Sequence, residues 1–372
     1  MKIAVMLRHL DEPGGICMYT VNLLRALLEI DEDNQYLFLY KDDRFLGSFG
    51  VKSNVEEHVI RIKNKILWDQ FGVPRVCEKK GVDVIFNPKL SVPLFTKIKT
   101  AFTLHGAEQF AVSKVFKWYD RAYFKMVMPL YYRRADVVFT QTISGRYDIG
   151  RLLGVDTGKV KVIRGSYNEL CRVVESRDEL DAARLEYNLP DRFLLFVGGI
   201  TPLKNFGRII RAFKIVKDRG YGGKLVVVGF KKWKYSKDVA TIDELSLDEE
   251  VKFVGYVQDK DIPYFYNLAD TLVFPSIYEG YGVPPLEALV SGCPVVASKT
   301  GWLRDVENAP VRLVDPYSVE DIAEGIWDVL ENLSDMKRAV LKWAQDYKFP
   351  TWKGYAEEFL STLREVVVGK NV

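Results

Sequence analysis

The sequence predicts an α/β protein with two doubly wound parallel-sheet domains. Short apolar runs typical of buried parallel strands alternate with segments of helical spacing along the 372 residues. The alternation is interrupted once, by a charged stretch at 169–186 that contains no convincing strand. The length also exceeds what a single hydrophobic core usually supports. We therefore expect two domains, divided near 164–170.

The strands are expected wherever an apolar run is bounded by turn residues. The first half opens with a strand at 2–7 and a helix at 16–29, with Gly14 and Gly15 in the turn between them. Its further strands are expected at 36–40, 59–62, 82–86, 101–104, 137–140 and 160–163. The second half repeats the scheme, with strands at 193–197, 224–228, 251–254, 271–274, 295–298 and 311–314. The tail is predicted to form one long amphipathic helix that begins near Thr351 or Trp352.

Composition excludes several classes of protein. A hydrophobic content of 48% and a charged content of 28% are those of a folded domain. The net charge of +3 gives no reason to expect nucleic acid as a partner. The four cysteines form no closely spaced pair, so neither a zinc site nor a disulfide framework is expected. We expect a cytoplasmic protein without a signal peptide or membrane span, which meets lipid only at its surface.

The most informative stretch is 275–294. A strand is expected to end at Pro275, a glycine-rich turn follows, and helical spacing begins at Pro284. Glu279 lies in the turn and Glu287 about one helical turn inside the helix. Glycines between them allow close approach of a ligand, and free N–H groups at a helix start favour an anion. The residues alone also fit a solvated Glu279 and a Glu287 that only interacts with the helix dipole.

The nonapeptide Glu-Gly-Tyr-Gly-Val-Pro-Pro-Leu-Glu at 279–287 resembles the Glu-seven-Glu signature of the family 4 retaining glycosyltransferases. The resemblance implies the GT-B fold, in which two Rossmann-like domains face a cleft and the C-terminal helix crosses back to the N-terminal domain. It assigns residues 1–167 with about 352–372 to an acceptor-side domain. Residues 168–351 become the domain that binds the nucleotide-sugar donor.

The resemblance also implies roles for individual residues. Lys204, in a segment at 197–205 similar to the family's phosphate-binding segment, would neutralise the donor diphosphate. Glu279 would contact sugar hydroxyls and Glu287 the ribose hydroxyls, while His105 would touch the transferred sugar. These three groups, His105, Lys204 and Glu279, are the predicted catalytic residues. Further donor contacts are expected from Gly14, Gly15, Gly198, Gly199, Tyr256, Val257, Gly280, Tyr281, Gly282 and Val283.

One position departs from the family pattern. Many members carry an arginine directly after the Val-Gly of the phosphate-binding segment, whereas this chain has Gly199 there. The missing charge would be left to Lys204 and backbone amides, or supplied by another basic residue such as Lys231 or Lys232. His9, just past the first strand, is a weaker candidate for a contact in the cleft.

No cofactor or metal is expected. Asp31-Glu-Asp33 has the acid-x-acid form of some metal-dependent sugar transferases, but its polar setting after a helix is typical of a turn. In the family, retention of configuration arises by attack on the face from which the leaving group departs. The departing diphosphate then takes the acceptor proton, and the protein contributes positioning and electrostatics.

Basic and aromatic residues are concentrated at 114–134. Lys117, Arg121 and Lys125 are spaced as one helical stripe, whereas Phe116, Tyr119, Tyr123, Val127 and Leu130 are expected to face the core. The stripe fits a solvated surface, but with Trp118 it also fits contact with an anionic membrane.

The function predicted from the sequence is the transfer of a hexose from GDP-mannose or a UDP-hexose to a glycan or lipid-linked saccharide, as in cell-surface polysaccharide or glycolipid synthesis. A sugar-nucleotide 2-epimerase would share the architecture without this combination of Glu279, Glu287 and Lys204. A nucleotide-sugar binding module without catalysis would lose the groups on the sugar side. The base, the sugar and the acceptor are left open by the sequence.

Overall fold

The computed structural model describes residues 1–12, 14–229 and 236–369. Two compact units make up the chain, Met1–Gly165 with Pro350–Val372, and Ser166–Phe349. We call them unit 1 and unit 2. The division between them falls inside the predicted stretch 164–170 and two residues before the predicted boundary at 167.

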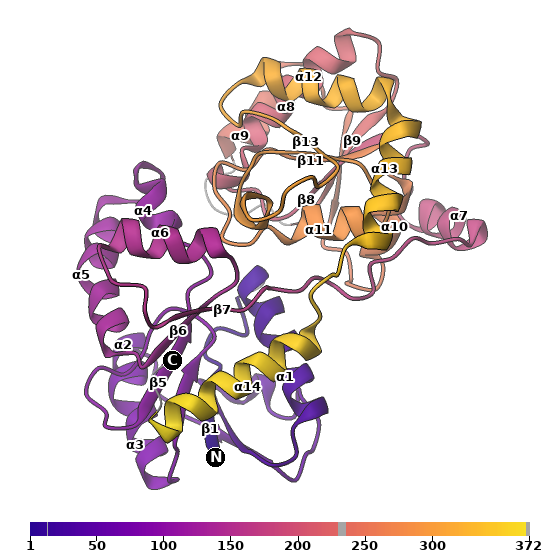
Figure 1. Ribbon diagram of the computed structural model, residues 1–372. Helices are drawn as coiled ribbons and strands as arrows, with labels where there is room; N and C mark the ends of the chain where they lie inside the picture. Colours follow the sequence, from indigo (N-terminus) through magenta and orange to yellow (C-terminus); the bar gives the residue numbers. More distant parts are fainter. Residues whose placement is uncertain (13, 230–235, 370–372) are drawn as a thin grey trace. The chain divides into compact units, whose positions relative to one another are not determined.

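Unit 1 is built on one parallel sheet of seven strands in the order β3-β2-β1-β4-β5-β6-β7 (Figure 1). The order reverses direction at β1 and β4, so the sheet is doubly wound and its carboxyl edge there is a usual place for ligands. The strands are β1 (Lys2–Met6), β2 (Gln35–Tyr40), β3 (Val55–Val59), β4 (Val84–Asn87), β5 (Lys99–Thr103), β6 (Val137–Thr140) and β7 (Val160–Val162).

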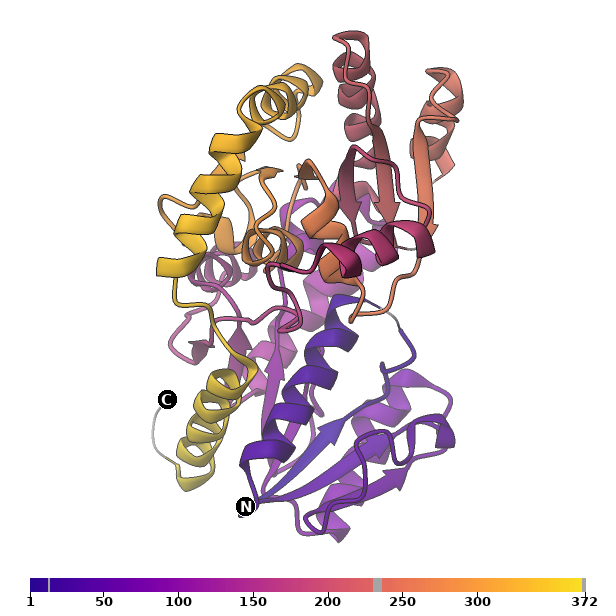
Figure 2. The ribbon, with the colours of Figure 1, turned by 90° about the vertical axis from the view of Figure 1, so that its right-hand side faces the viewer.

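The C-terminal helix belongs to unit 1, as predicted. Helix α14 (Trp352–Val368) begins at its N-cap Thr351 and packs beside α1 (Gly15–Ile30) on one face of the sheet (Figure 2). The hydroxyl groups of Tyr19 on α1 and Tyr355 on α14 are 2.8 Å apart. The remaining helical elements of unit 1 are η1 (Asp43–Phe45), α2 (Lys65–Leu67), η2 (Trp68–Gly72), α3 (Val73–Lys79), α4 (Glu108–Ala111), η3 (Ser113–Val115), α5 (Trp118–Arg134) and α6 (Ile143–Leu153).

Unit 2 repeats the scheme with six parallel strands in the order β10-β9-β8-β11-β12-β13. Helices α8 and α12 cover one face of this sheet, and α10, α11 and α13 cover the other, each over its own apolar core. The strands are β8 (Phe193–Val197), β9 (Lys224–Val228), β10 (Val251–Gly255), β11 (Thr271–Phe274), β12 (Val295–Ala297) and β13 (Val311–Leu313). The helical elements are α7 (Arg177–Glu186), η4 (Pro202–Lys204), α8 (Phe206–Asp218), α9 (Ser236–Glu244), α10 (Ile262–Leu268), α11 (Val283–Val290), η5 (Gly301–Arg304), α12 (Val319–Glu331) and α13 (Leu333–Asp346).

Two local predictions are wrong. The strand expected at 59–62 lies earlier, at β3, an edge strand of sequence Val-Glu-Glu-His-Val that is only half-buried throughout and so lacks an apolar run. On α5 the core is reached by Met128, Tyr131 and Tyr132, whereas Tyr119 and Leu130 are nearly half exposed. Apolar residues occur all around this helix, so their spacing alone does not fix the buried face.

Candidate functional site

The carboxyl edge of the unit 2 sheet begins with three glycines at the ends of neighbouring strands. The N–H of Gly198 donates to Val228, and the N–H of Gly229 donates to Gly255. Gly229 has a φ of +130°, and a Cβ there would lie 2.3 Å from the carbonyl oxygen of Gly198. Because no side chain fits at Gly229, the backbones at this edge can approach each other and a ligand closely.

Lys204 and Glu279 meet at this edge, as an ion pair. The Lys204 Nζ lies 2.7 Å from Glu279 Oε1 and 4.5 Å from the centre of the Phe274 ring. Both side chains are largely shielded, with exposed fractions of 22% and 12%. The structure thus brings together two of the three predicted catalytic residues.

Asn205 holds the loop that carries Lys204 and was not singled out from the sequence. It adopts a left-handed backbone with φ of +62° and is buried. Its side-chain amide donates to the carbonyl oxygens of Pro275 and Pro316, at 3.0 and 2.6 Å. The N–H of Ile277 also donates to Leu203, at 2.8 Å. These bonds fix the loop before α8 against the loop that carries Glu279.

Trp302 holds the glycine-rich turn in place by two hydrogen bonds. Its main-chain N–H donates to Tyr281 O at 2.8 Å, and its indole N–H donates to Gly282 O at 2.9 Å. Gly301, just before it, has a φ of +55° and passes so close that a Cβ would lie 2.0 Å from Tyr281 O. The turn from Glu279 to Gly282 is therefore held by the strand-end loop that follows β12.

Helix α11 begins one residue earlier than predicted, at Val283, with Gly282 as a left-handed N-cap. Pro284 and Pro285 occupy its next two positions and have no N–H. The helix start thus offers an anion fewer donors than expected. The side chain of Tyr281 is buried in the core.

Glu287 is buried one turn inside α11. Its carboxylate accepts hydrogen bonds from the Tyr266 hydroxyl at 2.9 Å and from the main-chain N–H of Asn168 at 3.2 Å. Burial raises the pKa of Glu287 to about 7, partly offset by these two donors. The ionised carboxylate retains acceptor capacity beyond these two bonds, so it can also receive a pair of hydroxyl groups.

Tyr256 and Val257 follow β10 and differ in exposure. The side chain of Tyr256 is 60% exposed, whereas Val257 is buried in the core of unit 2. Only the main chain of Val257 is thus available to a ligand. Gly199 lies beside Gly198 and is half-buried, and Lys231 and Lys232 lie outside the described residues.

In unit 1 the predicted residues lie near the point where the strand order reverses. His105 follows β5, its Nε2 lies 2.7 Å from the carbonyl oxygen of Pro88, and its ring packs edge-on against Tyr19. A carbonyl only accepts, so Nε2 carries the proton, and burial lowers the pKa of the imidazole. The Nδ1 of the same ring lies 3.4 Å from Gln141 Oε1, so the ring is anchored on both sides, in an orientation suited to contact a substrate.

Gly14 and His9 complete the predicted set in this unit. Gly14 caps α1 with a φ of 143°, and Gly15 begins the helix. His9 is buried, with Nε2 2.9 Å from the Thr20 hydroxyl, and burial followed by the charge of Lys89 lowers its pKa to about 3. His9 is thus anchored by Thr20, and it lies in the lining of a small hollow at the carboxyl ends of β1 and β4.

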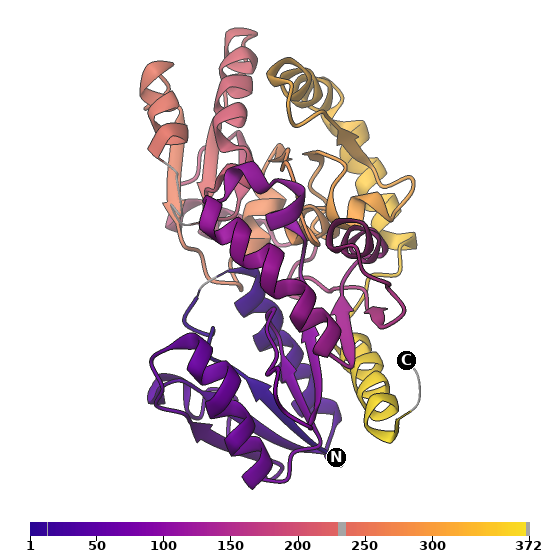
Figure 3. The same ribbon diagram turned by 90° about the vertical axis from the view of Figure 1, so that its left-hand side faces the viewer.

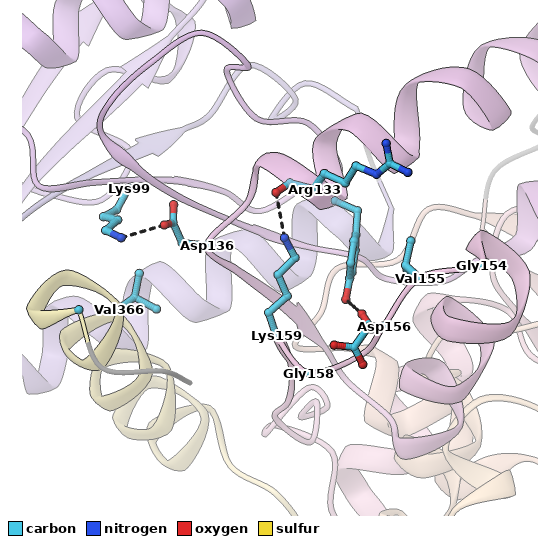
Figure 4. Close-up of a pocket in the computed structure, with 11 residues that line it drawn as sticks. Lys99, Arg133, Asp136, Gly154, Val155, Asp156, Gly158, Lys159 and Val366 are labelled. Carbon is cyan, nitrogen blue, oxygen red and sulfur yellow. Dashed lines mark hydrogen bonds and ion pairs between the residues drawn. The ribbon is translucent and has the colours of Figure 1, made fainter.

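A cavity of about 760 Å³ lies at the amino edge of the unit 1 sheet, opposite the carboxyl edge where β5 leads into His105. It lies beside the end of α14 (Figure 4). Two lysines in its lining bond to other groups of the protein. Lys99 pairs with Asp136 at 3.0 Å, and Lys159 donates to the carbonyl oxygens of Arg133 and Ala135. This cavity is lined by none of the predicted site residues.

The acid-x-acid stretch is a turn, as predicted. Asp31 ends α1 and accepts hydrogen bonds from the main chain and side chain of Asn34 and from the Tyr36 hydroxyl. Among the described residues, no group of three or more His, Cys, Asp or Glu side chains is placed to hold a metal ion. The four cysteines are free thiols.

The two parallel-sheet units and the edge that carries Lys204, Glu279 and Glu287 define a protein of the GT-B class. Residues 178–343 match the model of a family described as glycosyl transferases group 1. This match lies within unit 2 and includes the signature at 279–287.

Curated relatives agree with this assignment. The O-antigen chain mannosyltransferase RfbU of Salmonella typhimurium is 26% identical, over 96% of this chain and 99% of its own length. The O-antigen chain mannosyltransferase B of Escherichia coli is 27% identical over 46% of this chain. That match spans only 45% of the Escherichia coli protein.

Solved structures share the fold of the whole chain. HepE from Anabaena, in complex with UDP and glucose, superposes with a TM-score of 0.76 and 18% identity, over 98% of this chain and 100% of its own. The sucrose-phosphate synthase of Thermosynechococcus elongatus gives a TM-score of 0.80 at 18% identity and covers both chains fully.

Proposed function

We propose that the protein is a retaining, metal-independent glycosyltransferase that moves a hexose from a nucleoside-diphosphate sugar to a glycan or lipid-linked saccharide. The observation that carries the proposal is the ion pair of Lys204 and Glu279 at the glycine-lined edge of unit 2. The pair brings a cation and a carboxylate together inside the segment that matches the glycosyltransferase family, which supports a donor site there.

Each predicted residue then has a role. Lys204 neutralises the donor diphosphate, together with main-chain amides of Gly198, Gly199 and residues 280–283. Glu279 receives hydroxyls of the sugar, and Glu287 receives those of the ribose. Tyr256 and the main chain of Val257 border the base. His105 keeps the sugar contact, and Gly14 and Gly15 keep the phosphate contacts, that the resemblance implies.

The reaction is a displacement at the anomeric carbon. The acceptor hydroxyl oxygen forms a bond to C1 on the face from which the diphosphate leaves, and the C1–O bond to the phosphate breaks. The acceptor proton passes to the departing phosphate oxygen. Lys204 offsets the negative charge that builds on that oxygen, so catalysis is mainly electrostatic.

The relatives favour mannose as the sugar. RfbU is named as a mannosyltransferase of O-antigen chains and aligns over nearly the full length of both proteins. We therefore place GDP-mannose first among the donors and a UDP-hexose second, and expect a saccharide acceptor of a cell-surface polysaccharide or glycolipid.

Contact with an anionic membrane is proposed for the exposed side of α5 (Figure 3). Trp118 and Met126 are 78% and 72% exposed, and Arg121 and Lys125 lie exposed beside them. Aromatic and basic groups on one exposed surface favour binding at a lipid interface. Among the described helices, none is long and apolar enough to cross a membrane.

Vesicle flotation tests the membrane contact. The protein should float with vesicles that contain phosphatidylglycerol at low salt, and a variant with Trp118→Ala and Lys125→Gln should float less. A matched variant on an exposed helix of unit 2, Lys214→Gln, should behave as the wild type. Equal flotation of all three proteins would remove α5 from the interface.

A nucleotide and donor panel tests the main proposal. UDP, GDP or ADP should raise the unfolding temperature when it fits the donor site, since a ligand that binds only the folded state stabilises it. The matching nucleotide sugar should be hydrolysed slowly to the nucleoside diphosphate and the free sugar with retained configuration. Release of a 2-epimer would favour the epimerase, and binding without release from any donor would favour the binding module.

A further inference from the structure

A second group of charges lines a hollow in unit 1, at the carboxyl ends of β1 and β4. Its walls include Arg8, Lys65 and Lys89, together with the acidic side chain of Asp69. These residues come from three separate segments, the loop after β1, the short helices α2 and η2, and the loop after β4. The hollow encloses only about 10 Å³, about the room of one water molecule, so a larger ligand would rest on its mouth.

The cations here are poorly neutralised by the protein. Arg8 and Lys65 are both half-buried, and neither side chain makes a hydrogen bond or an ion pair with another residue in the described part of the chain. Lys89 pairs with Glu12, a side chain that is itself 53% exposed. Asp69 is buried and accepts a hydrogen bond from the Ser91 hydroxyl at 2.9 Å.

Half-buried cations without a bonded partner destabilise the folded protein unless an anion binds to them. A charged group that is partly removed from water without a hydrogen-bonded partner loses solvation free energy, and no direct bond compensates for the loss. The pKa of Lys65 is lowered, chiefly by burial. The charge of Asp69 opposes this shift, those of Lys89 and Arg8 add to it, and that of Glu12 opposes it. The incompletely neutralised cations therefore favour the binding of an anion. They lie at the carboxyl edge of a parallel sheet, where ligands of such sheets bind.

We propose that Arg8, Lys65 and Lys89 form a subsite for a phosphate or diphosphate group of a substrate. Phosphate oxygens suit this set, because a guanidinium donates in pairs and each ammonium adds a point charge. Lys89 directly follows Pro88, whose carbonyl oxygen anchors His105, so the subsite adjoins the predicted sugar contact. A substrate phosphate bound there lies beside the group that His105 touches.

The source of the phosphate rests on the proposed function. It belongs either to a phosphorylated acceptor or to the donor diphosphate, and both carry the same chemistry. Binding of phosphate itself does not depend on sugar transfer, which allows the two proposals to fail separately.

Site-resolved acetylation of lysines tests the subsite without any need for catalysis. The full-length protein is treated with an amine-acetylating reagent, with and without inorganic pyrophosphate, and the rate at each lysine is followed by mass spectrometry. Pyrophosphate at about ten times its Kd should slow the labelling of Lys65 and Lys89 roughly tenfold. Exposed Lys63 and Lys79 serve as internal controls and should be labelled at unchanged rates.

Variants show whether the cluster itself binds. Arg8→Gln should abolish the protection of Lys65 and Lys89, while Lys63→Gln should leave it intact. Lys204→Ala, which alters only the proposed donor site of unit 2, should leave it intact as well. Unchanged labelling of Lys65 and Lys89 with pyrophosphate, or protection that survives Arg8→Gln, overturns the proposal.

Two further probes distinguish the sources. Protection by a hexose 1-phosphate but not by GDP or UDP assigns the subsite to a phosphorylated acceptor. Protection by the nucleoside diphosphate that is lost in Glu287→Ala assigns it to the donor. Labelling protection without hydrolysis of any donor would keep the subsite and reject the glycosyltransferase.

Discussion

Lys204 in unit 2 and Lys65 in unit 1 are both partly shielded lysines at the carboxyl edge of a parallel sheet, yet the protein treats them differently. Lys204 has a carboxylate at 2.7 Å and an aromatic ring beneath it. Lys65 makes no ion pair and no ring contact among the described residues, and the charges of Asp69 and Glu12 only partly offset the effects of burial, Lys89 and Arg8 on its pKa. Lys204 is thus paired with a carboxylate of the protein, whereas the charge of Lys65 is neutralised by the phosphate ligand that we propose.

This difference has a consequence for binding. A phosphate that approaches Lys204 competes with Glu279 for the same ammonium, so part of its attraction is offset by loss of the existing pair. In the proposed function, that offset would weaken the binding of the diphosphate product, and Glu279 would then be available to the sugar hydroxyls. At Lys65 no such exchange is needed, so a phosphate should bind for its charge alone.

The largest expected effect follows from removal of the paired cation. Lys204→Ala should lower kcat roughly 10²–10³-fold, because one preorganised group that meets developing charge contributes about that much. KM for the donor should change less, since the other donor contacts are kept. Steady-state kinetics of donor hydrolysis and of transfer measure both constants. Lys214→Ala, at a half-buried lysine of α8 that also has a carboxylate partner, is the matched control. A Lys204→Ala enzyme with normal kcat would remove Lys204 from the site.

Glu287 gives the next largest effect, and it depends on pH. Its carboxyl has a pKa of about 7 in the folded protein against an ordinary 4.5, so between these values the folded state binds more protons than the unfolded state. Stability should therefore fall as pH rises from 4.5 to 7, by up to about 3 kcal/mol at 1.4 kcal/mol per pKa unit. The penalty is complete above pH 7 and absent below 4.5.

Denaturant unfolding across this window measures the effect. Glu287→Gln should lack the fall in stability, while the exposed control Glu331→Gln should retain it. The same variant should bind the donor nucleotide more weakly at pH 8, because the ribose hydroxyls lose an ionised acceptor. Parallel pH profiles for the wild type and Glu287→Gln would contradict the raised pKa.

Asn205 ranks third, as the residue that positions Lys204. Asn205→Gly keeps the left-handed backbone and leaves the carbonyl oxygens of Pro275 and Pro316 without their donor, which should cost about 2 kcal/mol of unfolding free energy. The donor loop loosens, so kcat should fall more than the donor affinity. Thermal unfolding with steady-state kinetics checks both. Asn188→Gly, at another left-handed asparagine of unit 2, should leave kcat unchanged.

The sequence predicted the fold well because most strands of both sheets are buried runs of apolar residues between turn residues. It misplaced β3, since an edge strand with two glutamates has no apolar run to mark it. Apolar residues on every side of α5 likewise concealed which face is buried. Periodicity thus identifies elements that are buried on both faces and fails where burial is partial.

The site was predictable only where its residues are neighbours in the chain. Glu279 and Glu287 share one motif, and Lys204 follows a strand end in a recognisable segment. Asn205 could not be found in this way, because its amide bonds reach 70 and 111 residues along the chain. Arg8, Lys65 and Lys89 were missed for the same reason, since only folding brings three separate segments to one hollow.

The smallest expected effect is also the one that most sharply separates the two lysines. Lys65→Met should raise the unfolding free energy at pH 7, by about 1 kcal/mol or less, because it removes a half-buried charge without a partner. The folded pKa of Lys65 lies below its ordinary 10.5, so the cost of its charge is present at neutral pH. The gain should shrink as pH rises toward 10.5 and disappear well above it, where the lysine is neutral in both states.

Lys204→Met should act in the opposite direction at the same pH, because it leaves the shielded carboxylate of Glu279 without its partner. Denaturant unfolding of the two variants, with and without pyrophosphate, separates the cases. Without pyrophosphate, Lys65→Met should be more stable than the wild type. With pyrophosphate, the wild type should be the more stable protein, since the bound ligand stabilises it and not Lys65→Met. A loss of stability in Lys65→Met without pyrophosphate would mean that the protein already neutralises this lysine, and the contrast between the two sites would disappear.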